Sequence, residues 1–233
     1  MTTKIYFEDF NHGPGGWLTW ISNARGAGAI EIENGVAISR SPWWIDYNHA
    51  PPGAGYLHLP FCLFTGHDVD HGKWEHLSGP NRFIDNNCPT DFRNAKVTLR
   101  VKGDVQLRGA QLLFHCQAKV GSVYVNYVLT GQPFQLTPEW NEQTVTLHTD
   151  PGQWTCLGSR HDRTDYYGEG PVEKVLADVS DDIIFVLYPL NVVPIEPIMG
   201  DMHQLKAGDD YSVRREFLPQ GAIMFDYVKI EWP

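Results

Sequence analysis

Short apolar runs, separated by turn-forming residues about every ten positions, are the feature that most constrains the fold of this 233-residue chain. Polar and apolar side chains alternate within these runs, most clearly in KVTLRVK at 96–102. A period of two places the apolar side chains of that stretch on one face of a strand. The same pattern recurs at 123–129 and 143–147. It predicts an all-β chain of antiparallel strands.

Three further stretches refine this prediction. Residues 30–38 read IEIENGVAI, and the central Asn-Gly pair accepts the positive φ angles of a type I′ turn, which predicts a hairpin. The uninterrupted apolar run at 183–187 is typical of a strand that is buried on both faces. Residues 171–178 have helical periodicity and begin with proline, so they predict the one short helix of the chain.

The charge of the chain disfavours two classes of partner. Lys and Arg number 18 against 28 Asp and Glu, which gives a formal net charge of -10. Nucleic acids and anionic membranes are recognised by clustered Lys and Arg, so we expect neither as a partner. A small-molecule or oligosaccharide ligand is compatible with this charge.

The cysteines and the apolar runs indicate the cellular compartment of the protein. No run is long enough for a transmembrane helix, and the N-terminal residues show no signal-peptide pattern, so we expect a cytoplasmic protein. The cysteines have no CxxC or zinc-finger spacing, and we expect them to be reduced and mostly buried; they are Cys62, Cys88, Cys116 and Cys156.

The two ends of the chain carry matching strand patterns. IYFEDF at 5–10, followed by Gly15-Gly16-Trp17, opens the chain, and IMFDYVKI at 223–230 closes it. In these residues and in its strand rhythm the chain resembles the β-jelly-roll carbohydrate-binding modules and the related galactose-binding-like and concanavalin-like sandwiches. The resemblance implies one antiparallel β-sandwich of jelly-roll type over residues 1–233, with the first and last strands adjacent.

The same resemblance implies a metal site. In many such modules a structural calcium ion lies where the opening acidic residue meets the closing Asp, and Glu8 and Asp226 match these positions. Carboxylates and loop carbonyls supply the roughly six to eight oxygens that calcium takes. Calcium is therefore the one cofactor that we expect. The alternative is that both carboxylates are solvated or pair with Lys4 and Lys229.

The loop SPWWIDYNHAPPGAGY at 41–56 is rich in rings at positions where Pro and Gly exclude regular structure. Rings on loops tend to be partly exposed, indole faces stack on the C–H patches of sugars, and Asp and His side chains bond hydroxyl groups. We therefore predict a ligand-binding loop formed by Trp43, Trp44, Asp46, Tyr47 and His49. Neighbouring side chains on an extended chain point to opposite sides, so one of the two indoles should be buried and the other exposed.

Two further polar loops are candidate sites. The stretch GSRHDRTDYYG at 158–168 supplies Arg160 and Arg163, which can bind a ligand carboxylate such as that of an acidic sugar. Its His161 and Tyr166 are candidate general base and acid if the protein is an enzyme. A network of ion pairs that only ties this loop down is an equal alternative.

The second of these loops, HDVDHGKWEH at 67–76, contributes His67 and His71 as further candidate catalytic residues. Its histidines and carboxylates are of the kinds that bind zinc, but their spacing matches no known metal motif, which favours an ordinary polar loop.

Two functions follow from these patterns. The first is a protein that recognises a carbohydrate or glycoside by aromatic stacking and polar loops. The second is a small hydrolase or lyase, or a subunit of one, that acts on a sugar or glycosylated compound through the 160–166 loop or the 67–76 loop. No familiar enzyme motif decides between them. A homo-oligomer or an enzyme-subunit partner that covers the aromatic loop is a third possibility.

Overall fold

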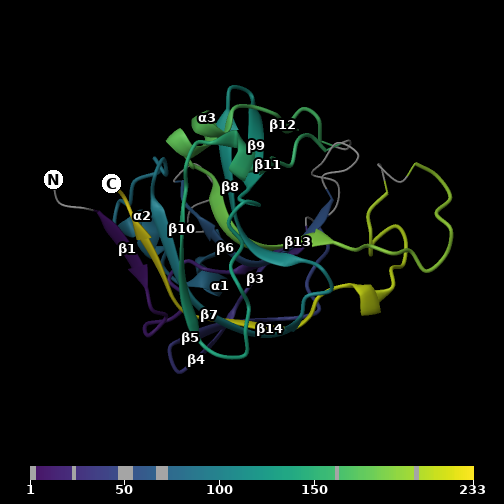
Figure 1. Cartoon of the computed structure of the whole chain (residues 1–233), viewed down its shortest axis with the longest axis horizontal. Helices are drawn as coiled ribbons and strands as arrows, with labels where there is room; N and C mark the ends of the chain where they lie inside the picture. Colours follow the sequence, from purple (N-terminus) through teal and green to yellow (C-terminus); the bar gives the residue numbers. More distant parts are fainter. Residues whose placement is uncertain (1–3, 23–24, 47–54, 67–72, 161–162, 202–204) are drawn as a thin grey trace.

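In the computed structural model of this protein, two β-sheets pack face to face (Figure 1). The structure describes residues 4–22, 25–46, 55–66, 73–160, 163–201 and 205–233. Sheet A contains β1 (Ile5–Glu8), β4 (Glu31–Glu33), β5 (Val36–Arg40), β7 (Lys96–Gln106), β10 (Asn141–Thr146) and β14 (Gln220–Glu231). Sheet B contains β6 (Tyr56–Phe64), β8 (Gln111–Val120), β9 (Val123–Val128), β11 (Thr155–Cys156), β12 (Tyr167–Gly168) and β13 (Asp182–Leu190). A small third sheet pairs β2 (Thr19–Ser22) with β3 (Gly26–Gly28).

The strand order confirms the predicted β-sandwich. Sheet A runs β10-β7-β14-β5-β4 with β1 beside β14, and sheet B runs β11-β9-β8-β13-β6 with β12 beside β9. One pairing departs from a purely antiparallel arrangement, because β12 runs parallel to β9 over two residues. The chain reverses its direction between β11 and β12, and both strands lie along the same edge of β9. One of them must therefore be parallel to it.

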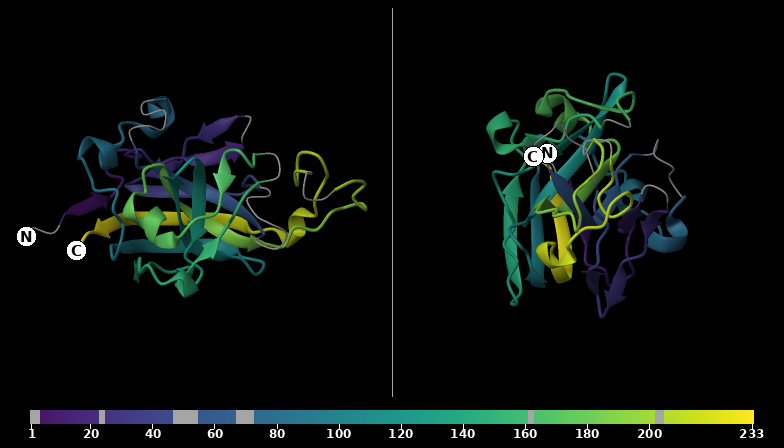
Figure 2. Two further views of the ribbon diagram at one scale, coloured as in Figure 1. Left: turned by 90° about the horizontal axis from the view of Figure 1, so that it is seen from above. Right: turned by 90° about the vertical axis from the view of Figure 1, so that its right-hand side faces the viewer.

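The first and last strands are neighbours, as the sequence predicted. β1 pairs antiparallel with β14, so that Tyr6 faces Ile230 and Glu8 faces Val228. The start of β1 and the end of β14 accordingly lie close together in both views of Figure 2. The predicted hairpin is also present, since β4 pairs with β5 and the turn residues Asn34 and Gly35 have φ angles of 52° and 75°.

Aromatic rings join the two sheets across the core. Phe225 of sheet A stacks on Phe61 of sheet B at 4.0 Å between ring centroids and meets Phe185 of sheet B edge-on at 5.0 Å. Trp17 stacks on the other side of this group, 5.7 Å from Phe185. Phe61, Phe185 and Phe225 come from inward positions of β6, β13 and β14, and all four rings are fully buried.

The predicted helix is α3 (Val172–Ala177), which buries Val172, Val175 and Leu176. The described part of the chain also contains two one-turn α-helices, α1 (Glu75–Ser78) and α2 (Arg82–Asp85), and two 3₁₀ turns, Pro151–Gln153 and Arg215–Phe217. A single turn is too short to show a period of 3.6 residues, so α1 and α2 were not predicted from the sequence. α2 is fixed by Asn81, whose side-chain oxygen accepts from the backbone N–H groups of Phe83 and Ile84.

Residues 191–219 connect β13 to β14 as a long arm that extends from one end of the sandwich (Figure 1). Its base is anchored because Val213 and Leu218 join the main core and the hydroxyls of Tyr211 and Tyr56 are 3.1 Å apart.

The cysteines agree with the sequence analysis. All four are free, Cys62, Cys88 and Cys116 are buried, and Cys156 is partly exposed. Within the described residues, the structure has no helix with the length and apolar character needed to cross a membrane.

Substitution of Trp43 tests the packing of this core. It is buried, and its indole N–H donates to the Ser39 hydroxyl at 2.9 Å. We expect Trp43→Ala to lower the free energy of unfolding by about 3–5 kcal/mol, because it leaves a cavity and an unpaired hydroxyl. Urea denaturation measures this change. Trp140→Ala is the control, since that ring is only half-buried, and equal losses in the two variants would contradict the assignment of Trp43 to the core.

Candidate ligand-binding cleft

Sheet B has apolar side chains on both faces. Along β13, Ile183, Phe185 and Leu187 point into the core between the sheets, whereas Ile184 and Val186 belong to a second apolar cluster on the outer face. The segment that leads into β2 covers part of this outer face. It is fixed to the edge strand β6 by Leu18 and Cys62, which exchange two backbone hydrogen bonds of 2.9 and 2.7 Å.

A cavity of about 230 Å³ lies on this outer face and is rich in aromatic rings. Three indoles, two phenols and one phenyl ring line it, and they come from β2, β6, β12 and two loops: Trp20, Trp44, Phe64, Trp74, Tyr166 and Tyr167. The Trp20 ring meets Trp74 edge-on at 6.0 Å and Phe64 edge-on at 6.3 Å. Trp20, Trp74 and Phe64 therefore form one continuous aromatic wall.

The three loops that the sequence singled out all reach this cavity. The 41–56 loop contributes Trp44 and Asp46, the 158–168 loop contributes Tyr166, and the end of the 67–76 loop contributes Lys73 and Trp74. Five other predicted site residues in these loops lie outside the described residues: Tyr47, His49, His67, His71 and His161. The structure thus brings together segments that are more than a hundred residues apart in the chain.

The two neighbouring tryptophans differ in burial, as the alternation of side chains along an extended chain predicted. Trp43 is buried, and Trp44 is half-buried at the cavity. His58 holds the backbone of Trp44 in place, because its Nδ1 lies 2.7 Å from the Trp44 carbonyl oxygen. Burial lowers the pKa of His58 to about 4, so the ring is neutral at pH 7 and donates to this carbonyl from Nδ1.

Arg160 and Arg163 contact the tyrosines of the cleft and do not line the cavity itself. The Arg160 guanidinium is buried 5.5 Å from the centroid of the Tyr167 ring, and the Arg163 guanidinium lies 4.3 Å from that of Tyr166. Tyr166 also stacks on Tyr124 at 4.5 Å. These contacts orient the two phenol rings, which is a supporting role for the arginines.

Two carboxylates that the sequence analysis did not single out lie in the cavity. Asp182 is the first residue of β13 and pairs with Gln117 of β8 and Phe64 of β6 in the sheet register. Asp181 precedes it, and both line the cavity with His115 and Gln117. The signal was present in the sequence: two acidic residues stand directly before a strand predicted to be buried on both faces. Charged groups at such a position must be buried too.

The carboxylate pair has unusual electrostatics. Burial raises the pKa of Asp181 to about 7, and burial together with the charge of Asp181 raises the pKa of Asp182 well above its usual range. Two acidic groups this close cannot both ionise readily in a poorly solvated site, so the pair retains a proton near neutral pH. Burial also raises the pKa of the Cys62 thiol in the same cavity, which keeps it protonated and a poor nucleophile.

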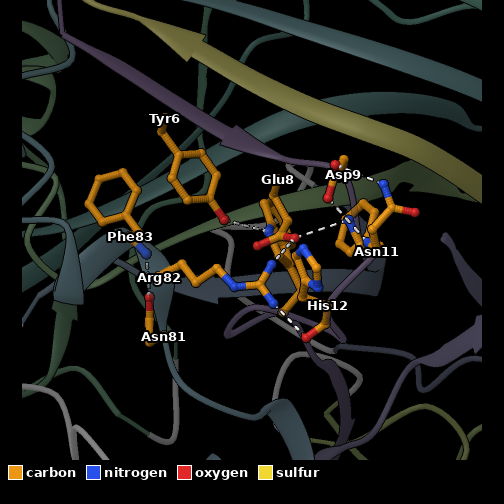
Figure 3. A network of polar contacts seen from close by, with 10 residues as sticks. Tyr6, Glu8, Asp9, Asn11, His12, Asn81, Arg82 and Phe83 are labelled. Carbon is orange, nitrogen blue, oxygen red and sulfur yellow. Dashed lines mark hydrogen bonds and ion pairs between the residues drawn. The ribbon is translucent and has the colours of Figure 1, made fainter.

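The two residues that the resemblance assigned to calcium each have an arginine partner. Glu8 is fully buried and accepts from Arg82, which also donates to the backbone carbonyl of His12 (Figure 3). Asp226 is 3.1 Å from Arg100 at the surface of sheet A. Among the described residues, no group of three or more His, Cys, Asp or Glu side chains is arranged to hold a metal ion. Calcium at Glu8 and Asp226 stays a prediction, and the lysine pairs considered as its alternative do not form.

Comparisons with known proteins add little to this geometry. No family model and no curated protein matches the chain. One similar solved structure comes from work entitled "Prominent members of the human gut microbiota express endo-acting O-glycanases to initiate mucin breakdown"; it is 10% identical, with 97% of each chain covered and a TM-score of 0.40. Another is the CBM2 module of the evolved Dit protein of Lactobacillus casei BL23 phage J-1, which is 15% identical, with 100% of this chain and 97% of that one covered and a TM-score of 0.35. Likenesses this distant carry no argument about function.

The retained proton predicts a pH dependence of stability. Between the ordinary Asp pKa of 3.8 and about 7, Asp181 is protonated in the folded state and ionised in the unfolded state, so unfolding releases a proton. Stability must therefore fall as the pH rises through this range. We expect the free energy of unfolding of the wild type, relative to Asp181→Asn, to decrease by up to about 4 kcal/mol between pH 4 and pH 7, since one pKa unit corresponds to about 1.4 kcal/mol.

Urea denaturation at a series of pH values measures this difference. Asp104→Asn is the control because Asp104 is exposed on β7, and it should follow the wild type at every pH. Parallel curves for the wild type and Asp181→Asn would show that Asp181 does not retain a proton in the folded protein.

Proposed function

We propose that this protein binds a neutral oligosaccharide or glycoside in the cavity on the outer face of sheet B. One observation carries the proposal: three indoles and several buried hydrogen-bonding side chains, brought together from distant loops and strands, surround a single cavity. Aromatic faces pack against the C–H patches of a sugar ring, and carboxylate, amide and imidazole groups bond its hydroxyls. This combination fits a sugar better than it fits a purely apolar ligand.

Trp44 is the central stacking residue of the proposal. It is half-buried and lies on a segment held at both ends, by His58 at its own carbonyl and by the backbone pairing of Asp46 with Leu57, at 2.8 Å between Asp46 N and Leu57 O. A ring that is already fixed loses little conformational entropy when it binds. The site is therefore preorganised on the Trp44 side.

Charge favours a neutral sugar over an acidic one. Asp46, Asp181 and Asp182 all line the cavity, and the chain as a whole carries a net charge of -10. Arg160 and Arg163, which suggested an acidic sugar in the sequence, contact tyrosine rings. Among the described residues of the lining, Lys73 is the one Lys or Arg side chain; it lies 5.0 Å from the Trp74 ring centroid and disfavours a positively charged ligand.

A second cavity supports a ligand longer than one sugar ring. It has a volume of about 340 Å³ and shares Trp20 and Trp44 with the first cavity. The two indoles thus line both spaces, and a chain of several sugar units can contact them from one cavity into the next. An oligosaccharide uses both cavities, whereas a monosaccharide fills only one.

The free cysteines support the cytoplasmic location predicted from the sequence. Three of the four are buried as thiols, and proteins of oxidising compartments commonly use their cysteines in disulfides.

Substitution of Trp44 tests the binding proposal. We expect the wild type to bind at least one member of a panel of neutral hexasaccharides (cello-, laminari-, xylo-, manno- and chitohexaose). Trp44→Ala should weaken that binding by roughly 10- to 100-fold, because a stacked ring contributes about 1.5–3 kcal/mol. Isothermal titration calorimetry measures both affinities.

Trp140→Ala is the matched control for this experiment. Trp140 is also half-buried but packs beside Lys102, at 4.8 Å from its ring centroid, and does not line either cavity. This variant should bind as the wild type does. Failure of the wild type to bind any member of the panel, or unchanged binding by Trp44→Ala, would reject the proposal.

A further inference from the structure

We propose that the cavity is also catalytic, with Asp182 and Asp181 as a carboxylate pair that hydrolyses a glycosidic bond of the bound sugar. This inference rests on the binding function proposed above and adds a chemical step to it. The sequence analysis placed a possible catalytic role on His67, His71, His161 and Tyr166. Of these, only Tyr166 belongs to the described residues, and the acid pair beside it had not been singled out.

The position of Asp182 is the first observation. Alternation along β13 puts its side chain on the outer face with Ile184 and Val186, where it lines the cavity. The residue is 8% exposed, and its Oδ1 has no hydrogen-bond partner among the residues that the structure describes. His115 Nδ1 is its closest cationic or imidazole neighbour in that part of the chain, at 3.8 Å from Oδ1, which is too long for a hydrogen bond. A buried carboxyl oxygen without a partner is costly for a folded protein, and a ligand hydroxyl or glycosidic oxygen supplies one.

Asp181 is the second observation. It is 4% exposed, lines the same cavity, and is fixed by its backbone, because its carbonyl accepts from the N–H of Thr65 at 2.9 Å. The groups that face the pair come from every element around the cavity. They are Asp46 before β6, Cys62 on β6, Lys73 before α1, His115 on β8, and Tyr166 and Tyr167 at β12.

The burial of both side chains keeps a proton on the pair. The raised pKa values of both aspartates agree with this geometry, and that of Asp182 is raised further by the charge of Asp181. Asp182, whose buried Oδ1 has no hydrogen-bond partner among the described residues, is assigned as the proton donor, and Asp181 is assigned as the acceptor. Glycoside hydrolysis requires a proton donor and a proton acceptor at one site.

The step balances within the pair and one water molecule. Asp182 donates its proton to the glycosidic oxygen as the bond between that oxygen and the anomeric carbon breaks. Water forms a new bond to the anomeric carbon, and Asp181 accepts the proton that this water loses. The pair has the same number of protons before and after the reaction. Transfer of a proton from Asp181 to Asp182 through solvent restores the starting state.

The experiment compares turnover with binding in the same protein. The hexasaccharide that binds most tightly is incubated with the wild type, and products are separated by anion-exchange chromatography. We expect shortened oligosaccharides, with one oxygen from ¹⁸O-labelled water in each new reducing end. Asp182→Asn preserves the shape of the side chain and removes the proton donor. It should lower turnover by roughly 100-fold or more while binding changes by less than about threefold.

Two readouts separate proton donation from a structural role. A 2,4-dinitrophenyl glycoside of the same sugar has a leaving group that needs no protonation, so Asp182→Asn should retain most of its activity on this substrate. The wild-type kcat/KM on the hexasaccharide should also rise as the pH rises toward about 7, because Asp181 must ionise before it can accept a proton from water. Asp104→Asn, on the exposed face of β7, is the control and should match the wild type in every assay.

The outcomes distinguish this inference from the binding proposal. If the wild type binds a hexasaccharide but yields no shortened product, the catalytic inference is wrong and the binding proposal stands. If no hexasaccharide binds and none is cleaved, both are wrong. Equal loss of activity on the hexasaccharide and on the dinitrophenyl glycoside would reject Asp182 as the proton donor. If Asp182→Asn does not fold, the pH profile of the wild type decides, and a profile that stays flat between pH 5 and pH 7 would overturn the inference.

Discussion

Strand β13 has almost no side chain that faces solvent, and this burial on both faces determines most of the rest of the structure. Its inward residues, such as Phe185, build the core between the sheets, and its outward residues, such as Ile184, require a second cover. The segment before β2 and the loop around Trp44 provide that cover. A sandwich whose sheet B faced water on the outside would need polar residues at these outward positions, and the chain has apolar ones. The third layer is therefore a consequence of the β13 sequence.

The cavity lies where the outward-facing side chains of β13 change from apolar to acidic. Val186 and Ile184 pack under the cover, and Asp182, two residues closer to the start of the strand, belongs to the same row. Because the register is fixed on both sides by β8 and β6, Asp182 cannot turn away from the cavity without moving Ile184 and Phe185 to the wrong faces. The register of β13 thus holds the Asp182 carboxyl group in a poorly solvated site. Because the charged form is disfavoured there, this carboxyl group retains a proton.

Much of the fold was accessible from the sequence because strand alternation, an Asn-Gly turn and matched terminal strands are local signals. One-turn helices and the parallel pairing of β12 carry no such periodic signal, and neither was predicted. For the site, the loop residues Trp44, Asp46 and Tyr166 were predicted from their chemistry alone, and the structure places them at one cavity. Arg160 and Arg163 contact tyrosine rings, which depends on tertiary packing that no local pattern records, and their binding of a ligand stays a prediction. Asp181 and Asp182 were missed because their role depends on what lies across the sheet, although their place before a buried strand was visible.

The central claim is that the outer face of sheet B, with the loops that meet there, forms one ligand site. The most direct measurement is the ¹⁵N–¹H spectrum of the indole groups, since the chain contains 8 tryptophans distributed between the core, the cavity and the surface. On addition of a neutral hexasaccharide, the account predicts shifts of the Trp20, Trp44 and Trp74 signals together, with Trp17, Trp140 and Trp154 unchanged. Shifts confined to Trp140 or Trp154, with the three cavity signals unmoved, would contradict it.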